Sequence, residues 1–422
     1  METGNVGWPY LLKRALGHHV RDRLREAAAR GTAHPVTTST ELAAAGARRT
    51  VVHPDPGPVP LRRPAGLDTG TWRSWRAGHL PAGGEQFVLD VRGATVVSGF
   101  GWVFDSGRLV TDLWRDADHP GERTRSAQRL AARVRPDGPA EHLPGTTASL
   151  LAPWALNYYH WTVQGVPRVG LLAAAADLAE VDRWLVPRLA HPYLGEWLDH
   201  LGVPPSARVE VSGAGRRFTA ERLLVSSVPS AGYNVPRWVV DDVRARVAGL
   251  RRGGGPELLL VDRPGTGRRR LLNREEVLRV VRERGFTVVD LDDATLAEEV
   301  ALFTSARVVV GVHGAGLTNA LYGPEGSHVV EITPSSLSYP TFHKLAGVAG
   351  LHHHVLPGTE PALPWRLRFL DNDADVVADV PALAHLLDRL LAGTHAVPAA
   401  PAPRAPGTAG AAGAPGTAGE VV

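Results

Sequence analysis

The positions of apolar residues make the second half of the chain strongly periodic. Beyond residue 256, short apolar runs alternate with segments that have helical spacing. The runs predict four strands, over residues 258–262, 286–290, 308–311 and 328–332. Alternating strands and helices predict a parallel sheet with helices on both faces, which is an α/β fold.

Two helix starts are marked by polar residues. Asn273 with Glu276, and Thr295 with Glu298, have the spacing of capping boxes. Two further helices are expected, one beginning near Gly314 and one over residues 380–392.

The rest of the chain is less regular. Residues 51–66 carry five prolines, residues 86–114 alternate like an antiparallel meander, and a Gly/Arg-rich break lies at 251–256. The repeated APGTAG near the C-terminus is low in complexity. Four segments are therefore predicted: a helical and Pro-rich lead-in (1–66), an N-terminal domain (67–250), a C-terminal Rossmann-like domain (256–395) and a disordered tail (396–422).

Composition excludes several classes of protein. Apolar residues make up 44% and charged residues 21% of the 422, as in soluble globular proteins. A net charge of +3, without basic runs interleaved with aromatics, gives no sign of a nucleic-acid partner. The chain has no cysteine, which excludes disulfides and thiolate metal sites. With no apolar segment long enough to span a membrane and no signal-peptide core, a cytoplasmic protein is expected.

A polar, glycine-rich turn follows the apolar strand at 308–311. It reads His313-Gly314-Ala315-Gly316 and leads into a predicted helix. Ligands of parallel sheets bind beyond the carboxyl ends of the strands, where glycines and a helix N-terminus favour phosphate. A tight turn with close helix packing would also explain the glycines. A dinucleotide fold is disfavoured, because these glycines follow about the third strand of the domain.

Two other stretches carry chemistry. Arg263 follows the first strand and precedes GTGRRR at 265–270, whose guanidiniums suit a diphosphate, although a solvated loop would explain some of them. Upstream, NYYHW at 157–161 is an aromatic patch around one histidine. It indicates either a sugar-contacting surface or a core aromatic cluster.

These blocks together resemble glycosyltransferase family 61. The resemblance rests on NYYHW with VPRVGLL, on LLLVDR with RRRLLNREEV, and on HGAGLTN, and it runs from about residue 85 to 390. This family includes plant xylan xylosyl- and arabinosyltransferases, animal secretory-pathway protein O-GlcNAc transferases and bacterial members, and this chain resembles a bacterial member. The first 80 residues and the tail have no counterpart that we identify, and an anchor like that of the eukaryotic members is not expected.

The resemblance implies a fold and a set of donor-binding residues. The fold is GT-B-like, with two Rossmann-like domains facing a cleft, and the reaction is inverting transfer from a nucleotide sugar, usually UDP-linked. Arg263 with Arg269 or Arg270 would contact phosphates. His313 and the backbone of Gly314, Ala315, Gly316 and Leu317 would cradle the diphosphate.

Four further positions are placed near the donor. Thr318 and Asn319 would reach the donor sugar or a phosphate. Asn273 either contacts the donor or only caps its helix. Glu331 either accepts hydrogen bonds from ribose hydroxyls or is a buried structural carboxylate.

Inverting transfer needs a base for the acceptor hydroxyl and positive potential at the leaving diphosphate. His160 is the candidate base, because its ordinary pKa suits neutral pH. Carboxylates at 90–120 remain alternatives: Asp90, Asp105, Asp112 and Asp116. The residues expected to contact the acceptor or its sugar are Asn157, Tyr159 and Trp161.

No metal or other cofactor is expected, since arginines and a helix terminus can neutralise the diphosphate and no Asp-x-Asp pair is present. The His352–His354 tract is predicted to be a surface strand. The sequence thus favours an inverting glycosyltransferase that acts on a hydroxyl of a glycan, protein or small molecule, in polysaccharide or glycan synthesis. The alternatives are a nucleotide-sugar epimerase or hydrolase of the same architecture and a non-catalytic binding scaffold.

Overall fold

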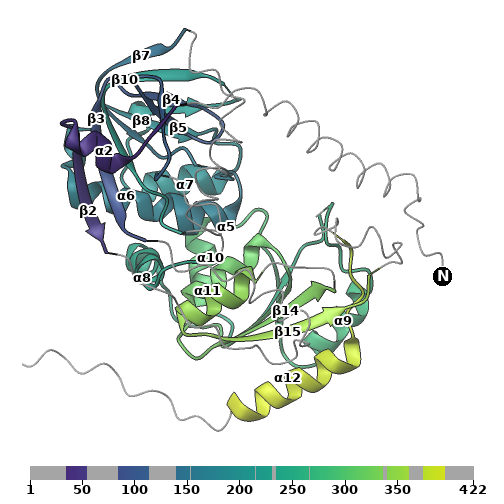
Figure 1. Ribbon diagram of the computed structural model, residues 1–422. Helices are drawn as coiled ribbons and strands as arrows, with labels where there is room; N and C mark the ends of the chain where they lie inside the picture. The colour runs from purple at the N-terminus through teal and green to yellow at the C-terminus, as the bar shows by residue number, and fades with distance from the viewer. Residues whose placement is uncertain are drawn as a thin grey trace, which may run out of the picture.

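Two β-sheets form the framework of the protein (Figure 1). The computed structural model describes residues 35–54, 84–113, 139–152, 154–213, 215–230, 234–265, 267–335, 340–360 and 374–394. The predicted disordered tail at 396–422 and the start of the lead-in lie outside these residues. In the described part of the chain, no helix is long and apolar enough to cross a membrane.

The smaller sheet is parallel throughout, as the sequence predicts. Its strands are β11 (Leu258–Asp262), β12 (Thr287–Asp290), β13 (Val308–Val312), β14 (His328–Pro334) and β15 (His352–Gly358). They lie in the order β12-β11-β13-β14-β15, and every pair is parallel. Strand β12 thus lies on one side of β11, and the next strand in the chain, β13, lies on the other side of β11. The strand order therefore reverses between β11 and β13, and their carboxyl ends form a topological switch point.

Helices cover both faces of this sheet. The apolar faces of α9 (Arg274–Arg282) and α12 (Val380–Thr394) form one core with it. On the other face lie α10 (Leu296–Thr304), the 3-10 helix η5 (Ala315–Tyr322) and α11 (Thr341–Ala349). These last three share their core with the larger sheet, so the apolar interior continues from one sheet to the other.

The two predicted capping boxes have different outcomes. The box of Thr295 and Glu298 forms at the start of α10. Asn273 makes no side-chain cap; instead its amide donates to the Ala378 carbonyl at 2.9 Å and accepts from the Ala378 N–H at 2.9 Å. Asn273 thus stands at the predicted start of α9, but the expected capping box does not form. Its side chain instead ties the start of α9 to the segment before α12.

The larger sheet has ten strands and is mixed. Its bounds are β1 (Val36–Thr37), β2 (Arg48–His53), β3 (Gln86–Arg92), β4 (Thr95–Val97), β5 (Trp102–Asp105), β6 (Arg108–Val110), β7 (Glu141–Ser149), β8 (Arg183–Pro187), β9 (Arg208–Val211) and β10 (Arg217–Ser226). Strands β10, β7, β8 and β9 pair in parallel, whereas β4, β5 and β6 pair antiparallel. A purely parallel, Rossmann-like sheet is therefore wrong for this half.

The antiparallel meander predicted for residues 86–114 forms only in part: β4, β5 and β6 pair as expected, but β3 does not pair with β4. Gly93, Ser106 and Gly107 have positive φ in the turns between β3 and β4 and between β5 and β6. However, β3 pairs with β10 and β2 and not with β4. The helix α2 (Ser39–Ala44) and strand β2 join this sheet, so the described part of the 1–66 lead-in is not a separate helical segment.

Helices on the larger sheet pack toward the smaller one. They are α5 (Tyr158–His160), the π-helix η1 (Trp161–Gly165), α6 (Val166–Ala175), α7 (Pro192–His200) and α8 (Arg237–Arg246), with the 3-10 turns η2 (Leu178–Glu180), η3 (Pro205–Ala207) and η4 (Ala248–Leu250). Helix α5 contacts η5, and Figure 1 places α5 beside α10 at the boundary between the sheets.

A buried polar contact lies at that boundary. The Tyr158 hydroxyl is 2.6 Å from Oε2 of Glu299 in α10 and 2.5 Å from Oδ1 of Asn319 in η5. A phenol carries one proton, so it can donate to only one of these oxygens. Burial raises the pKa of Glu299 to about 7, so its protonated carboxyl can donate to Tyr158 while Tyr158 donates to Asn319.

This contact predicts a pH dependence of stability. Because the folded state raises the pKa of Glu299 above its ordinary 4.5, wild-type protein should lose stability as pH rises from about 4.5 to 7. Glu299→Gln keeps a donor for Tyr158 and removes the titration. Its stability relative to wild type should rise over that range by up to about 3 kcal/mol.

Denaturant unfolding at pH 5 and pH 8 measures the difference. Glu276→Gln, at an exposed carboxylate of α9, is the control and should show no such trend. An equal difference between Glu299→Gln and wild type at both pH values would contradict the raised pKa.

Candidate functional site

The two sequence stretches expected to bind phosphate meet at the switch point. Nη1 of Arg263, after β11, donates to the carbonyl of His313, after β13, at 3.2 Å. A Cβ at Gly314 would lie 2.6 Å from that nitrogen. Gly314 has an extended backbone, with φ of 179°, so glycine is needed here for space and not for its conformation.

The second glycine of the turn has a different role. A Cβ at Gly316 would lie 3.2 Å from Val261 and 3.3 Å from Leu291, so its absence lets η5 pack against β11. Leu317 is buried in the core and Ala315 is half-buried. The turn thus combines a packing function with a backbone that faces the Arg263 guanidinium.

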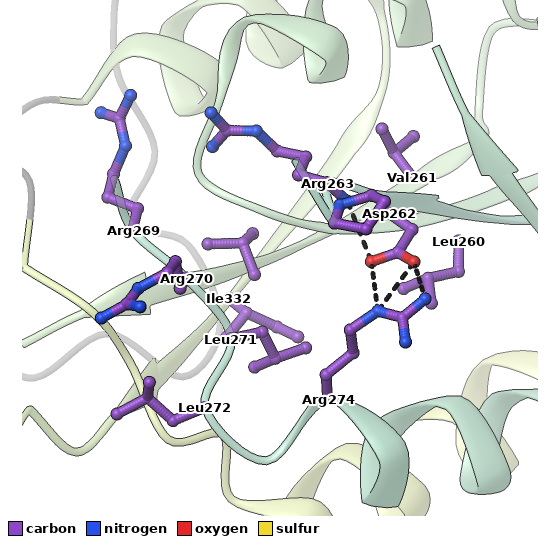
Figure 2. A pocket seen from close by; sticks show the side chains of 12 residues that line it. Leu260, Val261, Asp262, Arg263, Arg269, Arg270, Leu271, Leu272, Arg274 and Ile332 are labelled. Atoms are coloured by element: carbon purple, nitrogen blue, oxygen red, sulfur yellow. Dashed lines mark hydrogen bonds and ion pairs between the residues drawn. The ribbon is translucent and has the colours of Figure 1, made fainter. Parts of the chain in front are cut away.

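A pocket of about 270 Å³ lies beside this turn, at the carboxyl end of β11 (Figure 2). Figure 2 shows Arg263 and Arg269 extending to the same side, and Arg269 holds a positive φ of 52°. Arg270 forms an ion pair with Asp375 at 2.6 Å, and it points away from those two arginines. Of the expected phosphate contacts, the structure therefore groups Arg263 with Arg269.

Arg274 is a pocket residue that the sequence analysis did not single out. Its guanidinium forms an ion pair with Asp262 at 2.5 Å. That carboxylate also accepts the backbone N–H of Arg263 at 2.9 Å. Asp262 and Arg274 thus fix the start of the arginine loop, and the only sequence signal was an arginine in the first turn of α9.

Glu331 is a buried structural carboxylate. It is 1% exposed, and its two oxygens bind Nδ1 of His313 and, at 2.8 Å, Nε2 of His353. Burial acts to raise the pKa of Glu331, but the two histidines outweigh it and lower the pKa to about 2. Both carboxylate oxygens are therefore engaged by histidines, which favours the structural role of Glu331 over a ribose contact. Because Glu331 holds Nδ1, Nε2 is the nitrogen of His313 that can bind a phosphate.

Thr318 and Asn319 are both fully buried. Asn319 faces Tyr158, as described above. The structure thus gives neither side chain an exposed surface toward the donor, which corrects the expectation for both.

His160 is positioned by its neighbours in α5 and η1. Asn157 caps α5 through Oδ1, which accepts from the N–H groups of Tyr159 and His160. The residue is exposed, so its expected contact with a sugar stays a prediction. Nδ1 of His160 lies 3.0 Å from Oε1 of Gln164, whose amide donates to the Ser230 hydroxyl at 2.8 Å.

This chain of hydrogen bonds selects a tautomer. An amide oxygen can only accept, so Nδ1 of His160 carries the proton and Nε2 keeps its lone pair. Burial lowers the pKa of His160, although the Gln164 hydrogen bond acts in the opposite direction. The imidazole is therefore neutral at pH 7 and able to accept a proton at Nε2.

Two of the expected sugar-contacting aromatics are core residues. Trp161 is 0% and Tyr159 is 4% exposed, which corrects that expectation. Tyr159 instead links the two halves of the site. The centroid of its ring lies 5.3 Å from the ring of His160 and 6.0 Å from the ring of Phe342, and the Phe342 ring lies 5.2 Å from that of His313. Three ring contacts therefore connect the two histidines.

The alternative carboxylates have other partners. Asp90 is ion-paired with Arg222 at 2.9 Å, and Asp112 accepts from Ser39 at 2.5 Å. Asp105 lies 3.8 Å from Arg108. Asp116 is outside the described residues.

The histidine tract is only partly at the surface. The tract forms a strand as predicted, β15, which pairs with β14, and His352 is exposed. His353 is buried on Glu331, and Nε2 of His354 lies 3.0 Å from Nδ1 of His328. In the residues that the structure describes, no group of three or more histidine, aspartate or glutamate side chains could hold a metal ion.

Comparison with known proteins bears on residues 158–330. This segment, from α5 through most of β14, matches the family model described as Glycosyltransferase 61. The matched segment contains His160, the arginine loop and the turn at His313, so the comparison supports the family resemblance over these residues.

Several named glycosyltransferases are similar over short segments. The β-1,2-xylosyltransferase XAX1 of Oryza sativa subsp. japonica is 42% identical over 22% of this chain and 16% of its own. The α-1,3-arabinosyltransferase XAT3 of the same organism is 37% identical over 19% of this chain and 14% of its own. The protein O-linked-mannose β-1,4-N-acetylglucosaminyltransferase 2 of Canis lupus familiaris is 32% identical over 26% of this chain and 22% of its own. The chain thus aligns with less than a quarter of each relative.

The Arg263–Gly314 contact predicts how an anion is held. Gly314→Ala should displace the flexible end of Arg263 and weaken inorganic pyrophosphate binding about tenfold, while the melting temperature changes little. Gly267→Ala is the control, because a Cβ there meets nothing within 4 Å. Calorimetric titration with pyrophosphate measures both. Equal affinities of the two variants would show that Arg263 does not hold the anion.

Proposed function

We propose that the protein is an inverting glycosyltransferase that moves a sugar from a nucleotide donor, UDP-linked by preference, to a hydroxyl acceptor. The family domain and the names of its relatives support sugar transfer. The two sheets joined at α5 and η5 support a GT-B-like division of labour, with the donor on the smaller sheet and the acceptor on the larger.

The observation that carries this proposal is the state of His160. A neutral imidazole with a lone pair at Nε2 can act as the general base that inverting transfer requires on the acceptor side. Gln164 and Ser230 hold its tautomer, and the rings of Tyr159 and Phe342 connect it to the donor-side turn.

The chemical step then follows from these positions. Nε2 of His160 removes the proton of the acceptor hydroxyl as its oxygen attacks the anomeric carbon. The bond from that carbon to the diphosphate oxygen breaks, and the diphosphate leaves with the electron pair. Attack from the face opposite the leaving group inverts the anomeric centre.

The leaving group is stabilised from the smaller sheet. Arg263 and Arg269 supply positive charge, and Nε2 of His313 and the backbone at Gly314 supply hydrogen bonds. The fixed carboxylate of Glu331 orients His313 and does not itself contact the donor in this scheme.

His160→Ala should lower the transfer rate by roughly 100-fold or more, within the range of general base catalysis. UDP affinity should stay within a few-fold, because the base acts on the acceptor. In wild type the transfer rate should decrease as the pH is lowered below 6.5. Burial lowers the pKa of His160, and protonation below that pKa removes the lone pair that accepts the acceptor's proton. A normal rate in the folded variant would remove His160 from catalysis.

We also propose that transfer needs no divalent metal, because guanidiniums lie where the diphosphate is expected. Dialysis against EDTA should leave the transfer rate within about twofold of the untreated rate. Full loss of transfer in EDTA, with recovery on added manganese, would contradict the proposal.

A further inference from the structure

Trp154 is an exposed aromatic residue beside the candidate base. Its side chain is 51% exposed, whereas Trp102, Trp161, Trp184 and Trp197 are at most 2% exposed. Trp154 also has a positive φ of 53°, a conformation that costs a bulky residue free energy. The fold therefore holds an indole at the surface in a backbone conformation that a smaller residue would suit better.

Neighbouring segments fix the position of this indole. The Phe100 ring meets it edge-to-face at 6.0 Å, and Phe100 in turn lies 5.7 Å from the core residue Trp102. Gly101, with φ of 71°, lets the turn between β4 and β5 approach the chain just before Trp154: a Cβ there would lie 2.5 Å from the Leu151 carbonyl. Trp154 is thus supported from the core of the larger sheet.

The indole adjoins the group that accepts the proton. The rings of Trp154 and His160 lie 5.5 Å apart with an interplanar angle of 33°. A ligand that covers the exposed indole therefore comes to lie next to the imidazole. His160 belongs to the acceptor side of the proposed reaction, so the ligand that this position favours is the acceptor.

The chemistry of the platform fits a sugar ring. An aromatic face carries partial negative charge and attracts the polarised C–H groups on one face of a pyranose or furanose, while the sugar hydroxyls stay available at the ring edge. A rigid aromatic surface beside a base can hold one ring while its neighbouring hydroxyl reaches Nε2 of His160. An acidic peptide or an anion would gain little from the negative face of an exposed indole.

We propose that Trp154, supported by Phe100, is an acceptor platform on which a sugar ring of a carbohydrate chain stacks. The inference rests on the proposed transferase function and narrows its acceptor to a glycan. Trp154 acts by contact with substrate and takes no part in proton transfer. Trp154 lies just before the segment that matches the family model, which begins at residue 158.

Binding of the full chain to an array of immobilised neutral and anionic glycans tests the proposal. Wild type should retain at least one glycan class, and Trp154→Ala should lose about tenfold or more of that affinity, the scale expected for one aromatic stacking surface. Trp154→Phe keeps an aromatic face and should retain most of the binding. Val51→Ala is the control, because Val51 is also an exposed apolar residue but lies on β2; this variant should bind the glycan as wild type does.

Two measurements separate the possible failures. No glycan retained by wild type, or equal binding by Trp154→Ala and wild type, would overturn the platform. UDP affinity should be unchanged in Trp154→Ala; weaker UDP binding with unaltered glycan binding would show that the indole stacks on the donor base instead, which also overturns it. Trp154-dependent glycan binding without transfer from any nucleotide sugar would leave the platform standing and refute the transferase function.

Discussion

The packing of α5 against η5, with the Tyr158 hydroxyl buried between Glu299 and Asn319, joins the two halves of the molecule. His160 and the turn at His313 belong to different sheets, so their relative position depends on this contact. Breaking it would leave polar groups buried without partners, at a cost of about 1–3 kcal/mol each. Tyr158, which joins the sheets, is thus close in sequence to the proposed catalytic group, His160.

Elements of the smaller sheet could be predicted because each was specified locally. Buried parallel strands are continuous runs such as Val308–Val310, and Thr295 with Glu298 caps its helix through neighbouring atoms alone. Asn273 has the same sequence signature, but its amide binds the backbone of Ala378, 105 residues away. The strands of the larger sheet are also paired across long separations, which is why the sequence did not show that parallel and antiparallel pairs share one sheet.

Side-chain exposure in the site could not be predicted for a related reason. The sequence grouped Tyr159, Trp161 and His160 as one aromatic patch, and only packing decides which of them faces solvent. Trp161 is covered by the core that continues between the sheets, whereas Trp154, four residues before Tyr158, stays exposed. Glu331 posed the same problem, because its two histidine partners come from β15 and from the turn after β13.

The two candidate histidines differ in the partner of Nδ1, and this difference suits their proposed roles. Glu331 is ionised above about pH 2, so the partner of His313 is a permanent negative charge. The partner of His160 is the neutral amide of Gln164. A carboxylate at that position would stabilise the imidazolium and raise the pKa of the base. An amide instead fixes the tautomer without that effect, so burial keeps the imidazole neutral where the acceptor proton has to be taken up.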